Sequence, residues 1–213
     1  MTDTRVTPTQ VWQGMLEGNA RFVAGAPRHP RQDADRRHEI AGAQTPRAAL
    51  FGCSDSRLAA EIIFDEGLGD LFVVRNAGQV ISDSVVGSLE YAVVALGVSL
   101  IVVLGHDNCG AVAAAIESTA PDAPPLPPHV WRQVAPIVPA VRRVQAADHS
   151  EAGRIDPEHV GREHLRDTVK EMLHSSELIS QAVADGTLGI VAVNYRLAQG
   201  NVVPDVAVGI EQS

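Results

Sequence analysis

The fold of this chain is decided by two stretches, Phe51-Gly52-Cys53-Ser54-Asp55-Ser56-Arg57 and Leu104-Gly105-His106-Asp107-Asn108-Cys109-Gly110. Each of them follows a short apolar run, at residues 48–51 and 100–104 respectively. Short apolar runs that end at glycine are typical of buried strands in a parallel sheet. The polar residues of both stretches therefore stand where a strand ends and a helix begins. Open α/β sheets bind their ligands at that place.

Outward from these stretches, apolar runs and helical periodicities alternate along the chain. Strands are predicted at 47–52, 71–75, 100–104 and 187–195, and an edge strand at 202–208 follows a turn. Helices are predicted at 59–64, 82–96, from 109 onward, at 130–147 and at 158–184. We therefore expect an α/β fold. Its mostly parallel central sheet has four parallel strands plus an antiparallel edge strand, and helices flank it.

The two remaining segments are an N-terminal helix and a proline-rich connection. Helical spacing from about residue 9 predicts an N-terminal helical arm within residues 1–26, in which Trp12 and Phe22 either anchor a subunit contact or pack on the chain's own sheet. Residues 119–128 carry five prolines and are predicted to form a surface loop. The whole chain, 1–213, is expected to be a single domain.

Composition and charge exclude several classes of function. The 213 residues carry a formal net charge of −9, which argues against a nucleic-acid surface. The uncharged run over residues 92–105 is interrupted by Gly97 and falls short of the ~20 residues of a membrane helix. No secretory signal pattern stands at the N-terminus. We expect a cytoplasmic protein without membrane contact, whose thiols stay reduced.

The chain has only two cysteines, one in each of the two stretches. Together with His106, Cys53 and Cys109 form a set of three soft ligands, as in catalytic zinc sites that keep a fourth position for water. We expect one Zn²⁺ per chain. A redox pair is disfavoured because the cysteines are not in a C-x-x-C unit. A cysteine nucleophile with His106 as its base remains an alternative, although it leaves the second cysteine without a role.

Asp55 and Arg57 follow the first cysteine by two and four residues. Arg57 can hold the Asp55 carboxylate in a charge-assisted fork, and the held carboxylate can accept a hydrogen bond from zinc-bound water. Asp55 can instead bind the zinc itself and close the site. Because the two arrangements exclude each other, Arg57 is expected to act as a switch between them.

These residues resemble the β-class carbonic anhydrases, and the resemblance extends from about residue 10 to 208. The shared motifs are Cys-Ser-Asp-Ser-Arg at 53–57, Gly-His-x-x-Cys-Gly at 105–110, Arg75-Asn76, Glu90-Tyr91-Ala92 and Gly18-Asn19-x-Arg21-Phe22. The resemblance implies zinc held by Cys53, His106 and Cys109, with Asp55 and Arg57 as the functional dyad. It further implies reversible hydration of CO2 to bicarbonate and a proton by zinc-hydroxide attack. The implied assembly is a homodimer or homotetramer with the active-site cleft at the subunit interface.

The same resemblance assigns substrate-binding residues. Gln44 stands nine residues before Cys53, where plant-like members have a glutamine that hydrogen-bonds substrate. Phe72 and Tyr91 match aromatic positions that line the cleft from the partner subunit, although a strand core and a helix core are alternative places for them. The backbone N–H of Gly110 is a further candidate donor, because it opens a helix and glycine lets a small ligand approach.

One position departs from part of the family. Some bacterial members bind an inhibitory bicarbonate through a Trp–Arg–Tyr trio. Arg75 and Tyr195 match two of its members, but Leu50 occupies the tryptophan position. The pattern at the cleft is therefore closer to the plant-like subgroup.

Two rival functions fit parts of the pattern. A hydrolase of CS2 or COS would use the same scaffold, because that choice depends on access to the pocket. A non-catalytic zinc-stabilised module has no need for Asp55, Arg57 and Gln44 together, so their presence counts against it. The other seven histidines of the chain stand in no motif, and none is assigned as a proton shuttle.

Overall fold

The computed structural model describes residues 6–147 and 155–210. Its centre is a five-stranded sheet with the order β2-β1-β3-β4-β5. The neighbours from β2 to β4 pair parallel, and β5 pairs antiparallel with β4 at one edge. The predicted fold class is thereby confirmed. The strands are β1 (Ala48–Cys53), β2 (Leu71–Asn76), β3 (Leu100–His106), β4 (Gly189–Tyr195) and β5 (Val202–Val208).

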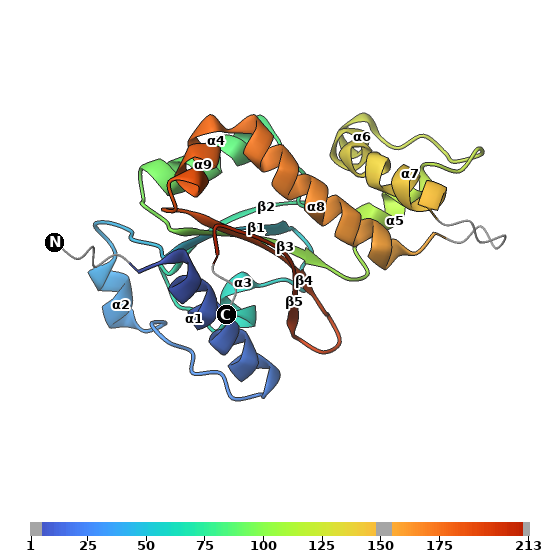
Figure 1. Ribbon diagram of the computed structural model, residues 1–213. Helices are drawn as coiled ribbons and strands as arrows, with labels where there is room; N and C mark the ends of the chain where they lie inside the picture. Colours follow the sequence, from blue (N-terminus) through green and yellow to red (C-terminus); the bar gives the residue numbers. More distant parts are fainter. Residues whose placement is uncertain (1–5, 148–154, 211–213) are drawn as a thin grey trace.

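Alternate strand residues enter two hydrophobic clusters, one on each face of the sheet, as the two-residue period of a strand requires. Leu50 and Val102 belong to one cluster, whereas Phe51 and Val103 belong to the other. The first cluster contains buried residues of α1 (Pro8–Val23), α3 (Ala60–Ile63), α5 (Gly110–Glu117) and α7 (Val138–Ala147). The second contains buried residues of α4 (Asp83–Val94), α8 (Pro157–Ser175) and α9 (Glu177–Ala184), which lie together above the sheet in Figure 1, although Val160 of α8 belongs to the first cluster. The remaining helical elements are α2 (Ala34–Glu39), α6 (Pro128–Val134) and the 3₁₀ turn η1 (Ala135–Ile137). Among the helices within the described ranges, none combines the length and the apolar character needed to cross a membrane.

The N-terminal helix α1 packs on the chain's own sheet. Trp12 is only 5% exposed and meets Phe64 edge-on, with ring centroids 6.5 Å apart. Of the two places expected for Trp12, the chain's own core is the one observed. Residues 1–5 of the predicted arm lie outside the described residues.

The helical segment predicted over 158–184 forms two helices instead of one, because the helix is interrupted at Ser176. This residue has extended backbone angles, and its hydroxyl accepts a hydrogen bond from the N–H of Ile179 at the start of α9. The same hydroxyl donates to Glu90 of α4 at 2.7 Å. The cap and the contact with α4 outweigh the local preference for one continuous helix.

Prolines also divide the segment that follows the surface loop. The helix predicted over 130–147 is divided into α6, η1 and α7, with Pro136 inside the 3₁₀ turn where it removes a helical hydrogen bond. Helix α6 already begins at Pro128, the last residue of the predicted loop over 119–128. Proline suits this first helical position, because the N–H that it lacks would have no partner there.

Asn19 ties the N-terminal helix to two distant parts of the chain, and its loss is expected to destabilise the fold. Its side-chain amide donates to the carbonyls of Ile63 and Gly200 and accepts from the N–H of Val202, at 3.0, 2.9 and 3.1 Å. Asn19→Ala leaves these three backbone groups buried without partners, so the free energy of unfolding should fall by about 3 kcal/mol or more. Urea denaturation measures this change.

The matched control is Gln13→Ala, on the exposed side of the same helix. Its free energy of unfolding should stay within about 0.5 kcal/mol of the parent. An Asn19→Ala variant that is equally stable would contradict the role of this amide.

Candidate metal centre

The two motif stretches meet because β1 and β3 are parallel neighbours in the sheet. Cys53 is the last residue of β1 and His106 the last of β3, so both strands extend slightly beyond their predicted ends at 52 and 104. Cys109 follows His106 through a tight turn in which Asn108 adopts a positive φ of 49°. Asparagine tolerates this left-handed conformation better than most residues. The turn brings Cys109 back to the end of the strand as the N-cap of α5.

The three predicted ligands lie together and are buried. The Sγ atoms of Cys53 and Cys109 and a ring nitrogen of His106 all lie within 4.8 Å of one another. Their residues are only 5%, 7% and 5% exposed, respectively. Such a cluster of soft donors can hold a metal ion, and the donor set matches that of a tetrahedral zinc site with one position open.

The state of His106 fits a metal. Its Nδ1 lies 2.7 Å from the Asp107 carbonyl oxygen, so a neutral imidazole donates its proton there and leaves Nε2 bare. Nε2 is buried, and no group in the described part of the chain hydrogen-bonds to it. A buried acceptor without a partner is costly, and a bound cation removes that cost.

The two thiols share one proton. A hydrogen bond from Cys109, together with one from the N–H of Gly78 at 3.3 Å from Sγ, lowers the pKa of Cys53 to about 4. The pKa of Cys109 is raised instead, because its proton serves the hydrogen bond to Cys53 and because burial and the neighbouring thiolate oppose a second negative charge. A divalent cation takes the place of this proton and allows both sulfurs to ionise.

Asp55 is held by Arg57, the first of the two arrangements expected for it. The guanidinium Nε and Nη2 donate to Oδ1 and Oδ2 at 2.8 and 2.7 Å, and the backbone N–H of Arg57 donates to Oδ1 at 2.9 Å. These bonds to Arg57 hold the pKa of the Asp55 carboxyl well below its usual range. Arg57 Nη2 also reaches the Asn108 carbonyl oxygen at 3.3 Å, which links the two motif turns. Within the described ranges, Asp55 is not part of the group of clustered ligand atoms.

Two side chains at the end of β2 support the site in ways that local pattern did not predict. Arg75 donates from Nε to the carbonyl of Cys53 at 2.9 Å and from Nη2 to that of Asp55 at 2.7 Å. Asn76 exchanges two hydrogen bonds with the backbone of Val80 and so closes the turn that contains Gly78. The sequence shows them only as a third polar strand end, Arg75-Asn76, one of the motifs that resemble the β-class carbonic anhydrases.

Gly110 lies where a small ligand has room. It is the first residue of α5, where the N–H groups have no partner within the helix. A Cβ added at Gly110 would meet no heavy atom within 4 Å. Gly110 therefore has open space on its side-chain side, next to Cys109.

The other three predicted substrate residues do not join the ligands within one chain. Gln44 is exposed in the loop before β1, so the whole six-residue strand, about 20 Å, separates it from Cys53. Phe72 lies four residues before the end of β2, about 13 Å back along the strand. Its ring contacts that of Tyr91 on α4, with centroids 6.1 Å apart, and Tyr91 is 51% exposed. A single chain therefore holds the ligands and Asp55 but not the predicted cleft.

Comparison with known proteins agrees with this geometry. The family model for carbonic anhydrase matches residues 48–202. Carbonic anhydrase 2 of Mycobacterium tuberculosis is 48% identical over 200 residues, and the carbonic anhydrase of Mycolicibacterium smegmatis is 46% identical over 196, with 92% of each chain covered in both cases. Among solved structures, the β-carbonic anhydrase CcaA superposes with a TM-score of 0.69 at 29% identity, covering 91% of this chain and 94% of that one. One of two tetrameric β-carbonic anhydrases from Sordaria macrospora shares the fold, with a TM-score of 0.68 at 24% identity over 82% of this chain and 91% of its own.

The chain therefore belongs to the carbonic anhydrase family of enzymes. Within that family it is a member of the β class, to which its structural neighbours belong and whose fold it shares.

The donor set predicts that metal binding is stoichiometric and releases protons. Titration of the metal-free protein with Zn²⁺ should reach one ion per chain and raise the melting temperature, because a ligand that binds only the folded state stabilises it. Metal analysis, a pH indicator and calorimetry measure these changes. Cys109→Ser should bind Zn²⁺ far more weakly, whereas Ser118→Ala, at the C-terminal end of α5, should bind it like the parent. Equal binding by both variants would place the metal elsewhere.

Proposed function

We propose that this protein catalyses the reversible hydration of CO2 to bicarbonate and a proton, with one Zn²⁺ held by Cys53, His106 and Cys109. The observation that carries the proposal is a buried Cys–His–Cys cluster, with an unpartnered His106 Nε2, beside an arginine-held carboxylate. Family membership and the names of the mycobacterial relatives support the same reaction. When bound, Zn²⁺ supplies a water of lowered pKa as nucleophile and a positive charge for the oxygen of the product.

Asp55 orients the attacking water. Each carboxylate oxygen has two lone-pair positions. Oδ1 already accepts two hydrogen bonds from Arg57, whereas Oδ2 accepts one and keeps a position free. Because the pKa of Asp55 is depressed, the group stays ionised at neutral pH and can only accept. A water that donates to Oδ2 must direct a lone pair elsewhere, which aligns it for attack on the carbon of CO2.

The N–H of Gly110 complements this arrangement. It lies at the open N-terminal end of α5, next to the ligand Cys109, and can donate to an oxygen of the substrate that gains negative charge. The site thus combines an acceptor for the nucleophile with a donor for the substrate. A non-catalytic zinc module needs neither of them.

Removal of the oriented acceptor should abolish most turnover and leave metal binding intact. Asp55→Asn replaces an acceptor-only group by one that also donates, and Arg57→Ala releases the carboxylate. Each variant should lose at least about 100-fold in kcat/KM for CO2 hydration, measured by stopped flow with a pH indicator at one Zn²⁺ per chain.

Asp122→Asn serves as the control, because this carboxylate is exposed in the proline-rich segment. It should keep full activity. Undiminished hydration in Asp55→Asn or Arg57→Ala would refute the dyad. An inactive parent with a full complement of zinc would refute CO2 hydration and direct the search to CS2 or COS.

We also propose that two chains share each active-site cleft. The edge strand β2 supports this proposal, because it pairs with β1 on one side and, within the described residues, with no strand on the other. Helix α4 packs on β2 and leaves Val94 65% and Tyr91 51% exposed. This apolar edge suits a second copy of the chain, and the tetrameric Sordaria enzymes support assembly of this kind.

A two-fold axis through the middle of β2 would complete the cleft. Two β2 strands related by that axis run antiparallel, so the start of one lies beside the end of the other. The partner's Phe72 then lies near the first chain's Arg75 and Asn76, which border the metal ligands. The same rotation carries the partner's Gln44, at the amino end of β1, toward the first chain's Cys53.

Complementation between two inactive variants tests the shared cleft. Cys109→Ser removes a metal ligand, and Gln44→Ala removes the proposed substrate contact in an exposed loop. If the cleft is shared, a mixed dimer has one intact site, formed by the ligands of the Gln44→Ala chain and the Gln44 of the Cys109→Ser chain. The CO2 hydration activity of the co-refolded mixture should then exceed the sum of the activities of the two variants measured separately.

A mixture of Cys109→Ser with His106→Ala is the control, because all three ligands must come from one chain. It should show no gain in activity. The absence of a gain in the Gln44→Ala mixture, with mixed dimers demonstrated by mass spectrometry, would confine each cleft to one chain.

A further inference from the structure

A buried histidine, outside every motif of the sequence, contacts the turn behind the metal ligands. His164 lies in the middle of α8 and is only 3% exposed. Its Nε2 lies 2.7 Å from the carbonyl oxygen of Gly78, so Nε2 carries the proton and donates it. Its Nδ1 is buried and has no hydrogen-bond partner within the described ranges. Burial lowers the pKa of His164, so the ring is neutral with its proton on Nε2.

The turn that His164 contacts is the one that donates to Cys53. The N–H of Gly78 points to the Cys53 Sγ at 3.3 Å, while its carbonyl accepts from His164. Gly78 has a φ of +82°, and a Cβ there would lie 2.8 Å from the Cβ of Ala111 on α5. The next residue, Gln79, also has a positive φ of 43° and is buried. Such backbone persists only where its surroundings hold it.

Helix α8 holds this turn at a second point. The Thr168 hydroxyl lies 3.4 Å from the Gln79 carbonyl oxygen, although its shorter bond, 2.9 Å, is to the His164 carbonyl in its own helix. Asn76 and Val80 close the turn from within. The strongest external bond that reaches Gly78 is therefore the one from His164.

The N–H of Gly78 matters to a metal because of the charge at this site. Two thiolates cancel the charge of Zn²⁺, so an N–H that points at a ligand sulfur withdraws electron density and restores part of the metal's Lewis acidity. Groups that orient a ligand from behind commonly change metal affinity or activity when they are removed. A displaced Gly78 would leave the Cys53 sulfur more basic and less precisely oriented.

We propose that His164 is a positioning residue for the metal centre, acting through Gly78 on the Cys53 sulfur. This inference rests on the metal site of the proposed function but not on its substrate. The chain of contacts runs from α8 to the turn after β2 and then to the end of β1, over two hydrogen bonds.

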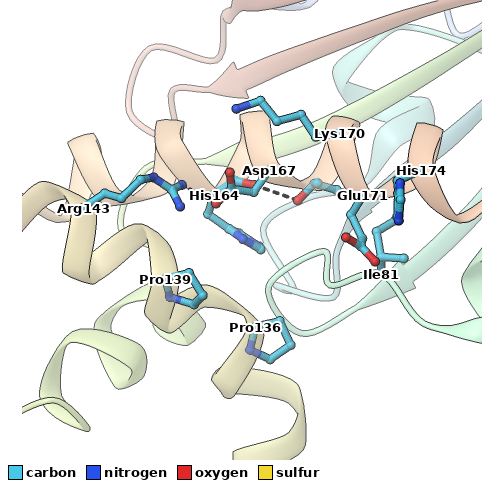
Figure 2. A pocket seen from close by; sticks show the side chains of 10 residues that line it. Ile81, Pro136, Pro139, Arg143, His164, Asp167, Lys170, Glu171 and His174 are labelled. Carbon is cyan, nitrogen blue, oxygen red and sulfur yellow. Dashed lines mark hydrogen bonds and ion pairs between the residues drawn. The ribbon is translucent and has the colours of Figure 1, made fainter.

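The surroundings of His164 allow substitution. It borders a surface pocket of about 780 Å³ between α7, α8 and the segment that carries Ile81. Figure 2 shows its side chain directed from α8 toward that segment, with Pro139 of α7 nearby, whereas Lys170 points away on the other side of the helix. A leucine or glutamine at position 164 therefore has space without forcing the core apart.

The test uses Co²⁺ in place of Zn²⁺, because thiolate-to-cobalt absorption reports on the ligand sulfurs without any need for turnover. His164→Leu removes the donor and should weaken Co²⁺ affinity by at least about 10-fold in competition with a chelator. It should also shift the thiolate-to-cobalt band. His164→Gln places an amide N–H at the reach of Nε2 and should restore both properties in large part, whereas the shorter His164→Asn should not.

Val169→Ala controls for a general loss of packing between α8 and the sheet, because Val169 is buried in the same helix and belongs to the second hydrophobic cluster. This variant should melt at a lower temperature and keep the parent's affinity and spectrum. His164→Leu or His164→Asn with an unchanged band and affinity would overturn the proposal, as would an equal change in Val169→Ala. If His164→Leu does not fold, the comparison of glutamine with asparagine decides. A parent that binds Co²⁺ but does not hydrate CO2 would refute the proposed function and leave this test valid.

Discussion

The site depends on the parallel pairing of β1 with β3 at the centre of the sheet. This pairing aligns Gly52 with Leu104, so Cys53, one residue after Gly52, and His106, two residues after Leu104, lie at the same end of the sheet. The strands β2 and β4 flank this pair, so both residues lie in the interior of the sheet rather than on an edge strand. A shift in this register would move one ligand relative to the other by about 3.3 Å along the strand direction for each residue. Core packing and ligand geometry are thus set by the same register.

Around the carboxyl ends of β1 and β3, the polar groups form two arrangements that differ in burial and in the roles proposed for them. Buried sulfurs and an imidazole meet at the centre, where a bound cation would compensate the charge of two thiolates. Asp55 and Arg57 lie at the exposed mouth, where solvent can supply and remove a proton. Arg75 and the turn of Gly78 stand behind the first arrangement and hold the backbone from which it projects. In the proposed function, this separation would let one side of the site bind metal while the other directs a small substrate.

The cleft is incomplete in one chain for a geometric reason. Chemistry in a parallel sheet belongs to the carboxyl ends of the strands. Gln44 precedes the amino end of β1. Phe72 lies near the amino end of the edge strand β2, where its ring contacts Tyr91 of α4. No rearrangement of side chains brings them across the length of a strand. In the dimer that we propose, a second chain related by a two-fold axis at β2 would do so without any change of fold, and it would cover an apolar edge that carries an exposed tyrosine and valine.

The amino-acid sequence by itself determined the fold class, the cluster of three candidate ligands and the Asp55–Arg57 pair, because each depends on patterns within a few residues: apolar runs, the glycines that end them and the polar groups that follow. Tertiary structure alone decided the break at Ser176, the burial of Trp12 and the bond from His164 to Gly78. The hydroxyl that interrupts the long helix caps α9 and donates to Glu90, 86 positions earlier in the chain. His164 and Gly78 are likewise separated by 86 positions, and nothing near either residue in sequence marks the contact. Local periodicity reports which face of an element is apolar, but it does not report which element that face meets.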